Sequence, residues 1–332
     1  MYDRYKSRKK STGIYKFLGA VLIVSSAVFI GVRYQHYLAF WKYNQSKLDK
    51  KIATVRHIQN VDKRREAIIA LSEAYERLKM ERMTDPGTFF VSGELHYLLG
   101  ETFLPGGFSD LYINDRVSEV GREAKAEFLK AIKDIKKGAA LEDGALDDAR
   151  SFMLAKAALY TEYYSPAEIF LMIENTGESI KQKDVENIRF YSAVNIANRR
   201  EDYGLKYLSE YGMVQDSMQG LLFYATAERM AKKYTGAIVS YKNVLARTSD
   251  ERVRKLVHIN LGKIYFNQTL YRESLDQFSL ALKIDARDAV PKIWIGKNYS
   301  AMGEKEKARA IWSEVLTTDG MNVEAKELMR TM

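Results

Sequence analysis

The feature that most constrains the fold is a 34-residue register between two segments near the C-terminal end, residues 255–287 and 289–320. In this register Leu261-Gly262 falls on Ile295-Gly296. Apolar residues recur at helical spacing in two short stretches of each segment, with a tight turn between the stretches. The register therefore predicts two successive helical hairpins that stack on each other.

The aligned residues follow the order of a known repeat. The aromatic and small residues that coincide are Tyr265 with Tyr299, Ser274 with Ala308, Phe278 with Trp312, and Ala281 with Val315. A 34-residue period with Leu-Gly, an aromatic residue, then Ala, Phe and Ala resembles the tetratricopeptide repeat (TPR). Gly262 and Gly296 would let the two helices of each hairpin approach closely. The resemblance implies an all-α, TPR-like helical-hairpin solenoid, a fold that mostly serves as a binding scaffold.

The repeat pattern continues upstream in a more degenerate form. Residues 218–250 carry Ala237, Tyr241 and Val244 in the positions of a second helix. The chain has only four prolines, each at an expected helix start or loop, which favours a nearly all-helical chain. We expect the solenoid to cover residues 61–332, with Val323–Arg330 as a polar cap.

One predicted hairpin contains an insertion, residues 104–116. Leu99, Gly100 and Phe103 suit a first helix, but the matching second-helix pattern at Ala124, Phe128 and Ala131 comes about a dozen residues late. Two interpretations of the insertion remain open. Its apolar side chains either tuck back against the solenoid or bind a partner; they are Phe108, Leu111 and Tyr112.

Charge is concentrated at the N-terminal end. Residues 1–61 contain twelve Lys or Arg against Asp3 and Asp49, which leaves the rest of the chain near −1 out of a total of +9. A nucleic-acid-binding protein carries its basic surface on the folded domain, so this distribution argues against such a partner. It indicates a membrane, with a basic cytoplasmic tail over residues 1–12.

A transmembrane signal anchor is predicted at residues 13–32, followed by a juxtamembrane helix over residues 33–60. Phe17–Val32 is uncharged, and counting back to Gly13 gives the roughly 20 residues that span a bilayer. More basic residues precede the span than closely follow it, so we expect a cytoplasmic N-terminus and an extracytoplasmic solenoid in the inner membrane. The alternative is a signal peptide cleaved after Ala27.

The sequence shows no pattern typical of catalysis, a metal site or a cofactor site. Cysteine is absent, which excludes disulfides, thiolate metal sites and thiol nucleophiles. The four histidines stand apart from one another, without metal-ligand spacing, and are expected to be ordinary polar residues. We therefore expect no cofactor and no enzymatic activity.

The candidate binding residues lie on the first helix of each hairpin, which lines the concave groove in TPR proteins. They are Asn260, Lys263, Phe266, Asn267, Ile293, Lys297 and Ser300. Lys263 and Lys297 are one repeat apart, so about 10 Å should separate them. Such a groove suits an acidic or C-terminal peptide, although both lysines could equally be simply solvated. TPR proteins that grip chaperone C-termini have Asn at the position of Lys263, which argues against that ligand here.

These features favour a membrane-anchored scaffold whose partners are other proteins of an envelope assembly. The order of a short basic tail, one membrane span and a TPR domain resembles the anchored TPR subunits of bacterial secretion, outer-membrane assembly and flagellar-motor complexes. Of these, this order slightly favours a flagellar collar. Two other functions remain open: a peptide-binding adaptor that faces the cytoplasm, and an envelope enzyme whose site is not recognised.

Overall fold

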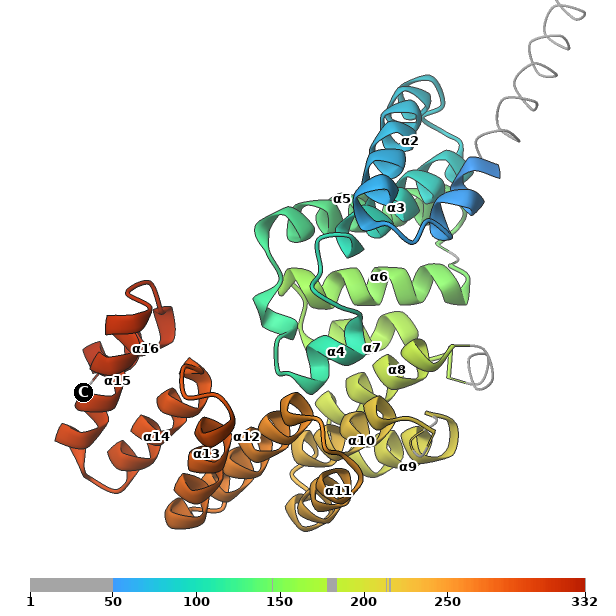
Figure 1. The fold of residues 1–332 in the computed structure, drawn as a ribbon. Helices are drawn as coiled ribbons and strands as arrows, with labels where there is room; N and C mark the ends of the chain where they lie inside the picture. The colour runs from blue at the N-terminus through green and yellow to red at the C-terminus, as the bar shows by residue number, and fades with distance from the viewer. Residues whose placement is uncertain (1–49, 145, 178–183, 213, 215, 332) are drawn as a thin grey trace, which may run out of the picture. The chain divides into compact units, whose positions relative to one another are not determined.

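The structure is a computed structural model that describes residues 50–144, 146–177, 184–212, 214 and 216–331. The chain forms two compact units, one up to Arg77 and one from Leu78 onward. The helices of the second unit are shown in Figure 1. The predicted tail, the anchor at residues 13–32 and most of the juxtamembrane helix lie outside the described residues. Within the described residues, no helix is both long enough and apolar enough to cross a bilayer.

In the first unit a turn separates two helical segments. Residues 50–56 are helical, and α2 (Val61–Glu81) begins after the turn and extends into the second unit. The side-chain oxygen of Asn60 accepts a hydrogen bond from the Lys63 amide at 2.9 Å. Asn60 therefore caps the first turn.

The second unit is a series of helical hairpins that pack in chain order. In the part of this unit that the structure describes, the series contains six pairs of helices: α3 (Pro86–Glu101) with α5 (Arg122–Leu141), α6 (Asp148–Thr161) with α7 (Pro166–Ile173), α8 (Val185–Ala197) with α9 (Glu201–Tyr211), α10 (Met218–Met230) with α11 (Tyr234–Arg247), α12 (Glu251–Asn267) with α13 (Tyr271–Ile284), and α14 (Ala289–Ala301) with α15 (Lys305–Thr318). The last helix, α16 (Val323–Thr331), packs on α15.

The small residues of the repeat make close helix contacts. A Cβ atom added to Gly262 would lie 2.7 Å from the ring of Phe278, and one added to Gly296 would lie 2.2 Å from the Trp312 indole nitrogen. That indole nitrogen also donates a hydrogen bond to the carbonyl of Ile293 at 3.1 Å. The expectation that these glycines permit close approach is confirmed.

The chain signals several helix starts locally. Ser165 and Glu168 form a reciprocal capping box, with Pro166 in the first turn of α7. Asp85 caps α3, whose first residue is Pro86, so this helix begins well before Leu99, where the repeat pattern becomes visible.

The connection between α3 and α5 contains a short helix that does not belong to a hairpin. This helix, α4 (Phe108–Ile113), is followed by a 3₁₀ turn, η1 (Val117–Glu119). α4 packs against α8 and α10, the first helices of two later hairpins (Figure 1). The insertion therefore returns to the face of the solenoid that the first helices form.

Candidate functional site

The apolar residues of the insertion are buried against the solenoid. Phe108, 4% exposed, meets Phe190 of α8 edge-on with ring centroids 5.0 Å apart. Tyr112 stacks on Phe223 of α10 at 4.7 Å. Leu111 is buried in the same cluster. These contacts match the first of the two interpretations of the insertion, in which its side chains tuck back against the array.

Polar contacts fix the orientation of α4. The backbone amide of Ser109 donates to Glu186 in the first turn of α8 at 3.0 Å. The buried guanidinium of Arg189 donates to the Ser109 hydroxyl at 3.3 Å and to the side chain of Gln219 at 3.1 Å. Gln219 in turn donates to Asp110 at 2.8 Å. α4 is thus tied to both α8 and α10 by polar as well as apolar contacts.

Two cations from successive hairpins converge on one carboxylate just beyond α4. Asp115 accepts hydrogen bonds from Arg229 of α10 and from Lys263 of α12, the second with the lysine nitrogen 2.6 Å from the carboxylate oxygen. Asp115 has φ of 56°, a left-handed conformation that is costly for most residues but less so for Asp. We call this arrangement the Asp115 bridge.

The cations belong to a longer series. Arg229, Lys263 and Lys297 are separated by 34 residues each, so they occupy one position in three consecutive repeats. We call these three residues the basic ladder. Lys297 pairs with Glu324 of α16 at 2.6 Å. Each member of the basic ladder is therefore matched by a carboxylate from another part of the same chain.

The electrostatics of the Asp115 bridge reflect burial and charge together. Burial alone raises the pKa of Asp115, but the positive charges and hydrogen bonds of Arg229 and Lys263 outweigh it and hold that pKa below its ordinary value. Burial lowers the pKa of Lys263, and the positive charges of Arg229 and Lys297 add to that effect against the pull of Asp115. The Asp115 carboxylate therefore offsets the repulsion between the neighbouring positive charges of Arg229 and Lys263.

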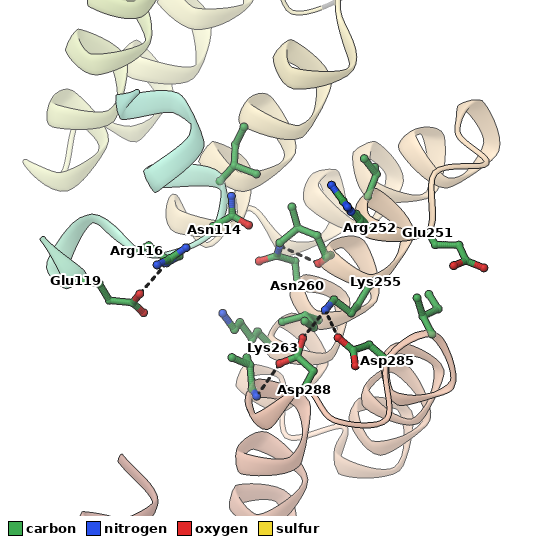
Figure 2. A pocket seen from close by; sticks show the side chains of 16 residues that line it. Asn114, Arg116, Glu119, Glu251, Arg252, Lys255, Asn260, Lys263, Asp285 and Asp288 are labelled. Atoms are coloured by element: carbon green, nitrogen blue, oxygen red, sulfur yellow. Dashed lines mark hydrogen bonds and ion pairs between the residues drawn. The ribbon is translucent and has the colours of Figure 1, made fainter. Parts of the chain in front are cut away.

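A pocket of about 790 Å³ lies beside the bridge, between the end of the insertion and helices α12 and α14. Figure 2 shows Asn114 and Arg116 on one side, with Asn260 and Lys263 of α12 facing them. Asn260 is only 1% exposed and its side-chain oxygen has no hydrogen-bond partner among the described residues. The amide nitrogen of the same side chain donates to the carbonyl of Leu256 at 3.0 Å, so Asn260 is held by its own helix.

The charged residues of this pocket are mostly engaged with one another. Lys255 lies between Asp285 and Asp288, at 2.9 and 2.7 Å from their oxygens, and Arg116 pairs with Glu119 at 2.7 Å (Figure 2). A second hollow of about 420 Å³ borders Asp115 and Arg229. The Asp115 bridge thus has a pocket at each of its two cations.

The other sequence-predicted residues are placed differently. Phe266 packs edge-on against Trp294 with centroids 5.3 Å apart, and Asn267 is exposed. Ser300 is half-buried. Ile293, expected to face the groove, is 3% exposed and packs with Val315 and Ala325, which makes it a core residue here. The structure thus brings Asn260 and Lys263 together in one pocket and leaves the rest outside it.

Two histidines make ordinary polar contacts. His96 lies 2.7 Å from a carboxylate oxygen of Glu127, and His258 lies 3.0 Å from the side-chain oxygen of Gln277. In both contacts the ring nitrogen faces a protein group.

Sequence reasoning missed Arg229 and Asp115. Arg229 could have been found, because counting back one period from Lys263 reaches it, but the first helix of the repeat at 218–250 has Glu228 and Ala231 where the next repeat has Gly262 and Tyr265, so the step was not secure. Asp115 gave no signal, since it lies in an insertion and 148 positions separate it from Lys263.

The chain was compared with known protein families, sequences and structures. No protein-family model matches the chain. A stretch of 104 residues is 28% identical to DnaJ homolog subfamily C member 3 homolog of Dictyostelium discoideum, and it spans 31% of this chain and 20% of that protein.

Among solved structures, a tetratricopeptide repeat protein from Parabacteroides merdae matches with a TM-score of 0.54 and 14% identity, over 86% of this chain and 98% of that one. Yeast Tom70 matches with a TM-score of 0.40 and 14% identity, over 81% of this chain and 58% of that one. The Parabacteroides match, together with the hairpin packing, shows that this chain has the all-α solenoid fold of TPR proteins.

Proposed function

We propose that this chain is a non-enzymatic scaffold that holds a protein partner through the basic ladder on the concave face of its solenoid. The observation that carries the proposal is that Arg229, Lys263 and Lys297 repeat in register and that carboxylates already sit on all three. Fixed cations of this kind suit an acidic segment of another protein. The fold supports the proposal because a solenoid presents an extended concave surface.

We further propose that residues 13–32 anchor the scaffold in an inner membrane, with the solenoid on the extracytoplasmic side. The support is the uncharged segment Phe17–Val32 with its excess of basic residues on the N-terminal side. Its partners are then proteins of an envelope assembly of the secretion or flagellar-collar type. Anchoring confines the scaffold to the plane of the bilayer and so raises its effective concentration near such partners.

The role of the ladder is tested by charge reversal at its most accessible member. Lys297→Glu should abolish crosslinking of the physiological partner in cells, as detected by mass spectrometry. The matched control is Lys242→Glu, the same change at an exposed position of the second helix α11. An identical set of crosslinked partners with Lys297→Glu and with the unmodified chain would refute binding through the ladder.

The orientation is tested separately in spheroplasts. Added protease should cleave the solenoid if it is extracytoplasmic, while a cytoplasmic marker protein stays intact. Protection of the solenoid until the membrane is lysed would instead support the adaptor that faces the cytoplasm.

A further inference from the structure

The Asp115 bridge has the composition of a carboxylate-binding site that is already filled. Arg229 and Lys263 come from two different hairpins, yet both donate to the same carboxylate. Arg229 is 9% exposed, and its Nε has no hydrogen-bond partner among the residues that the structure describes. Two cations on one carboxylate form a strong anion site, because charge-assisted hydrogen bonds are the strongest in proteins.

The connection that carries Asp115 is held in two different ways. Ile113 and Val120 are buried in the main apolar cluster and fix its ends. Between them, residues 114–119 are half-buried or exposed, and Val117 packs against the same apolar cluster from outside. Asp115 makes the ion pairs to the solenoid within this stretch. Asp115 can therefore leave its cations without undocking α4, and the chain would then also be relieved of a left-handed residue.

We propose that Asp115 occupies, within its own chain, a site that receives a carboxylate of the partner, so that the insertion competes with the partner for Arg229 and Lys263. This inference rests on the proposed function and adds a self-occupied state to it. In that state Asp115 neutralises two members of the basic ladder. In the partner-bound state residues 114–119 move aside and a carboxylate of the partner replaces Asp115.

The ladder also defines the spacing of acidic groups in the partner. The Lys263 and Lys297 ammonium groups lie 5.7 and 4.3 Å from the centroid of the same Trp294 ring. Their separation therefore cannot exceed 10.0 Å, the sum of these two distances. An extended segment in the polyproline II conformation rises about 3.1 Å per residue with three residues per turn, so side chains three residues apart lie on one side, about 9 Å from each other. The partner chemistry that fits is an extended segment with carboxylates about three residues apart.

Lys297 is the member from which exchange can begin. Its partner Glu324 has a side chain that is 53% exposed, whereas the Asp115 side chain is 24% exposed. Exposed ion pairs contribute little to stability, so an incoming carboxylate displaces Glu324 more easily than Asp115. Binding at Lys297 would then hold the next carboxylate of the segment close to the Asp115 bridge.

The test uses the full chain in an uncharged detergent and a fluorescein-labelled nonapeptide with Glu at every third position. Asp115→Asn should tighten peptide binding at least tenfold in fluorescence anisotropy, and the added Lys263→Gln change should remove the gain. Asp110→Asn is the matched control, because Asp110 lies on the same insertion but bonds to Gln219. The same peptide with Gln in place of Glu should bind no more tightly to Asp115→Asn than to the unmodified chain.

A second measurement needs no substitution. Saturating the unmodified chain with the Glu peptide should speed amide hydrogen exchange in residues 114–119 while α4 stays protected. Equal affinities of Asp115→Asn and the unmodified chain, or unchanged exchange in residues 114–119 with bound peptide, would overturn the inference. If partner capture still depends on Lys297 in that case, the proposed function stands. If Lys297→Glu leaves partner crosslinking unchanged while Asp115→Asn binds the Glu peptide more tightly, the proposed function is refuted and the competition by Asp115 is not.

Discussion

Replacing Phe108 by Ala tests whether the insertion is part of the folded core. The ring is 4% exposed and contacts the rings of Phe190, Phe223 and Tyr112 at centroid distances of 5.0, 6.1 and 5.6 Å. Removing a buried phenylalanine ring costs about 3–5 kcal/mol, since its transfer free energy is lost and a cavity remains. If the insertion lay in solvent, the same substitution would change the free energy of unfolding by less than about 0.5 kcal/mol.

The assay is urea unfolding followed by circular dichroism at a helical wavelength. With a slope of about 2–3 kcal/mol per molar urea, the expected loss lowers the midpoint by roughly 1–2.5 M. Leu171→Ala is the control, because this α7 side chain is 63% exposed and its removal should leave the midpoint nearly unchanged. Overlapping curves for Phe108→Ala and Leu171→Ala would refute the packing of the insertion.

Two further predictions concern the hairpin contacts and the Asp115 bridge. In the same urea assay, Gly296→Ala should destabilise the chain by about 1–3 kcal/mol, because the new methyl group would collide with the Trp312 indole. Gly87→Ala should be neutral or slightly stabilising, because its methyl group makes only an ordinary contact at 3.5 Å. Equal effects of the two changes would contradict the close approach at Gly296. The pKa of Asp115 is lower in the folded chain than in the unfolded chain, where it is about 3.9. The ion pairs of Asp115 therefore stabilise the fold fully above about pH 3.9, and this stabilisation is lost as the pH falls through the folded pKa. The difference in melting temperature between the unmodified chain and Asp115→Asn should therefore shrink below about pH 4, and a difference that persists there would contradict the assigned charge.

The periodic part of this fold could be predicted because each repeat encodes its own hairpin. Gly262 and Phe278 stand 16 positions apart in one hairpin, and their contact follows from helix geometry and the repeat pattern. Lys263 was identified in the same way, from its register with Lys297. Regular spacing thus carries information about neighbours within a repeat and between adjacent repeats.

The insertion could not be predicted in this way because its contacts are set by tertiary packing. Nothing near Asp115 in the sequence specifies that its carboxylate meets Lys263, 148 positions away. Apolar Phe108 and Tyr112 showed only that the insertion had something to bury, in the solenoid or in a partner. The depth of Ile293 in the core was also missed, because its position in the repeat does not reveal that α16 closes over that end.

The measurement that most directly tests the docking of the insertion on the solenoid is a crosslink between the insertion and α10. Asp110 and Gln219 are joined by a hydrogen bond of 2.8 Å, and the chain has no natural cysteine to compete with introduced ones. In dilute solution, a short bismaleimide should link Asp110→Cys to Gln219→Cys within one chain, giving a faster-migrating species in denaturing gels. Neither single variant should give this species, nor should the pair in concentrated urea. A native double variant that reacts at both thiols without an internal crosslink would contradict the account.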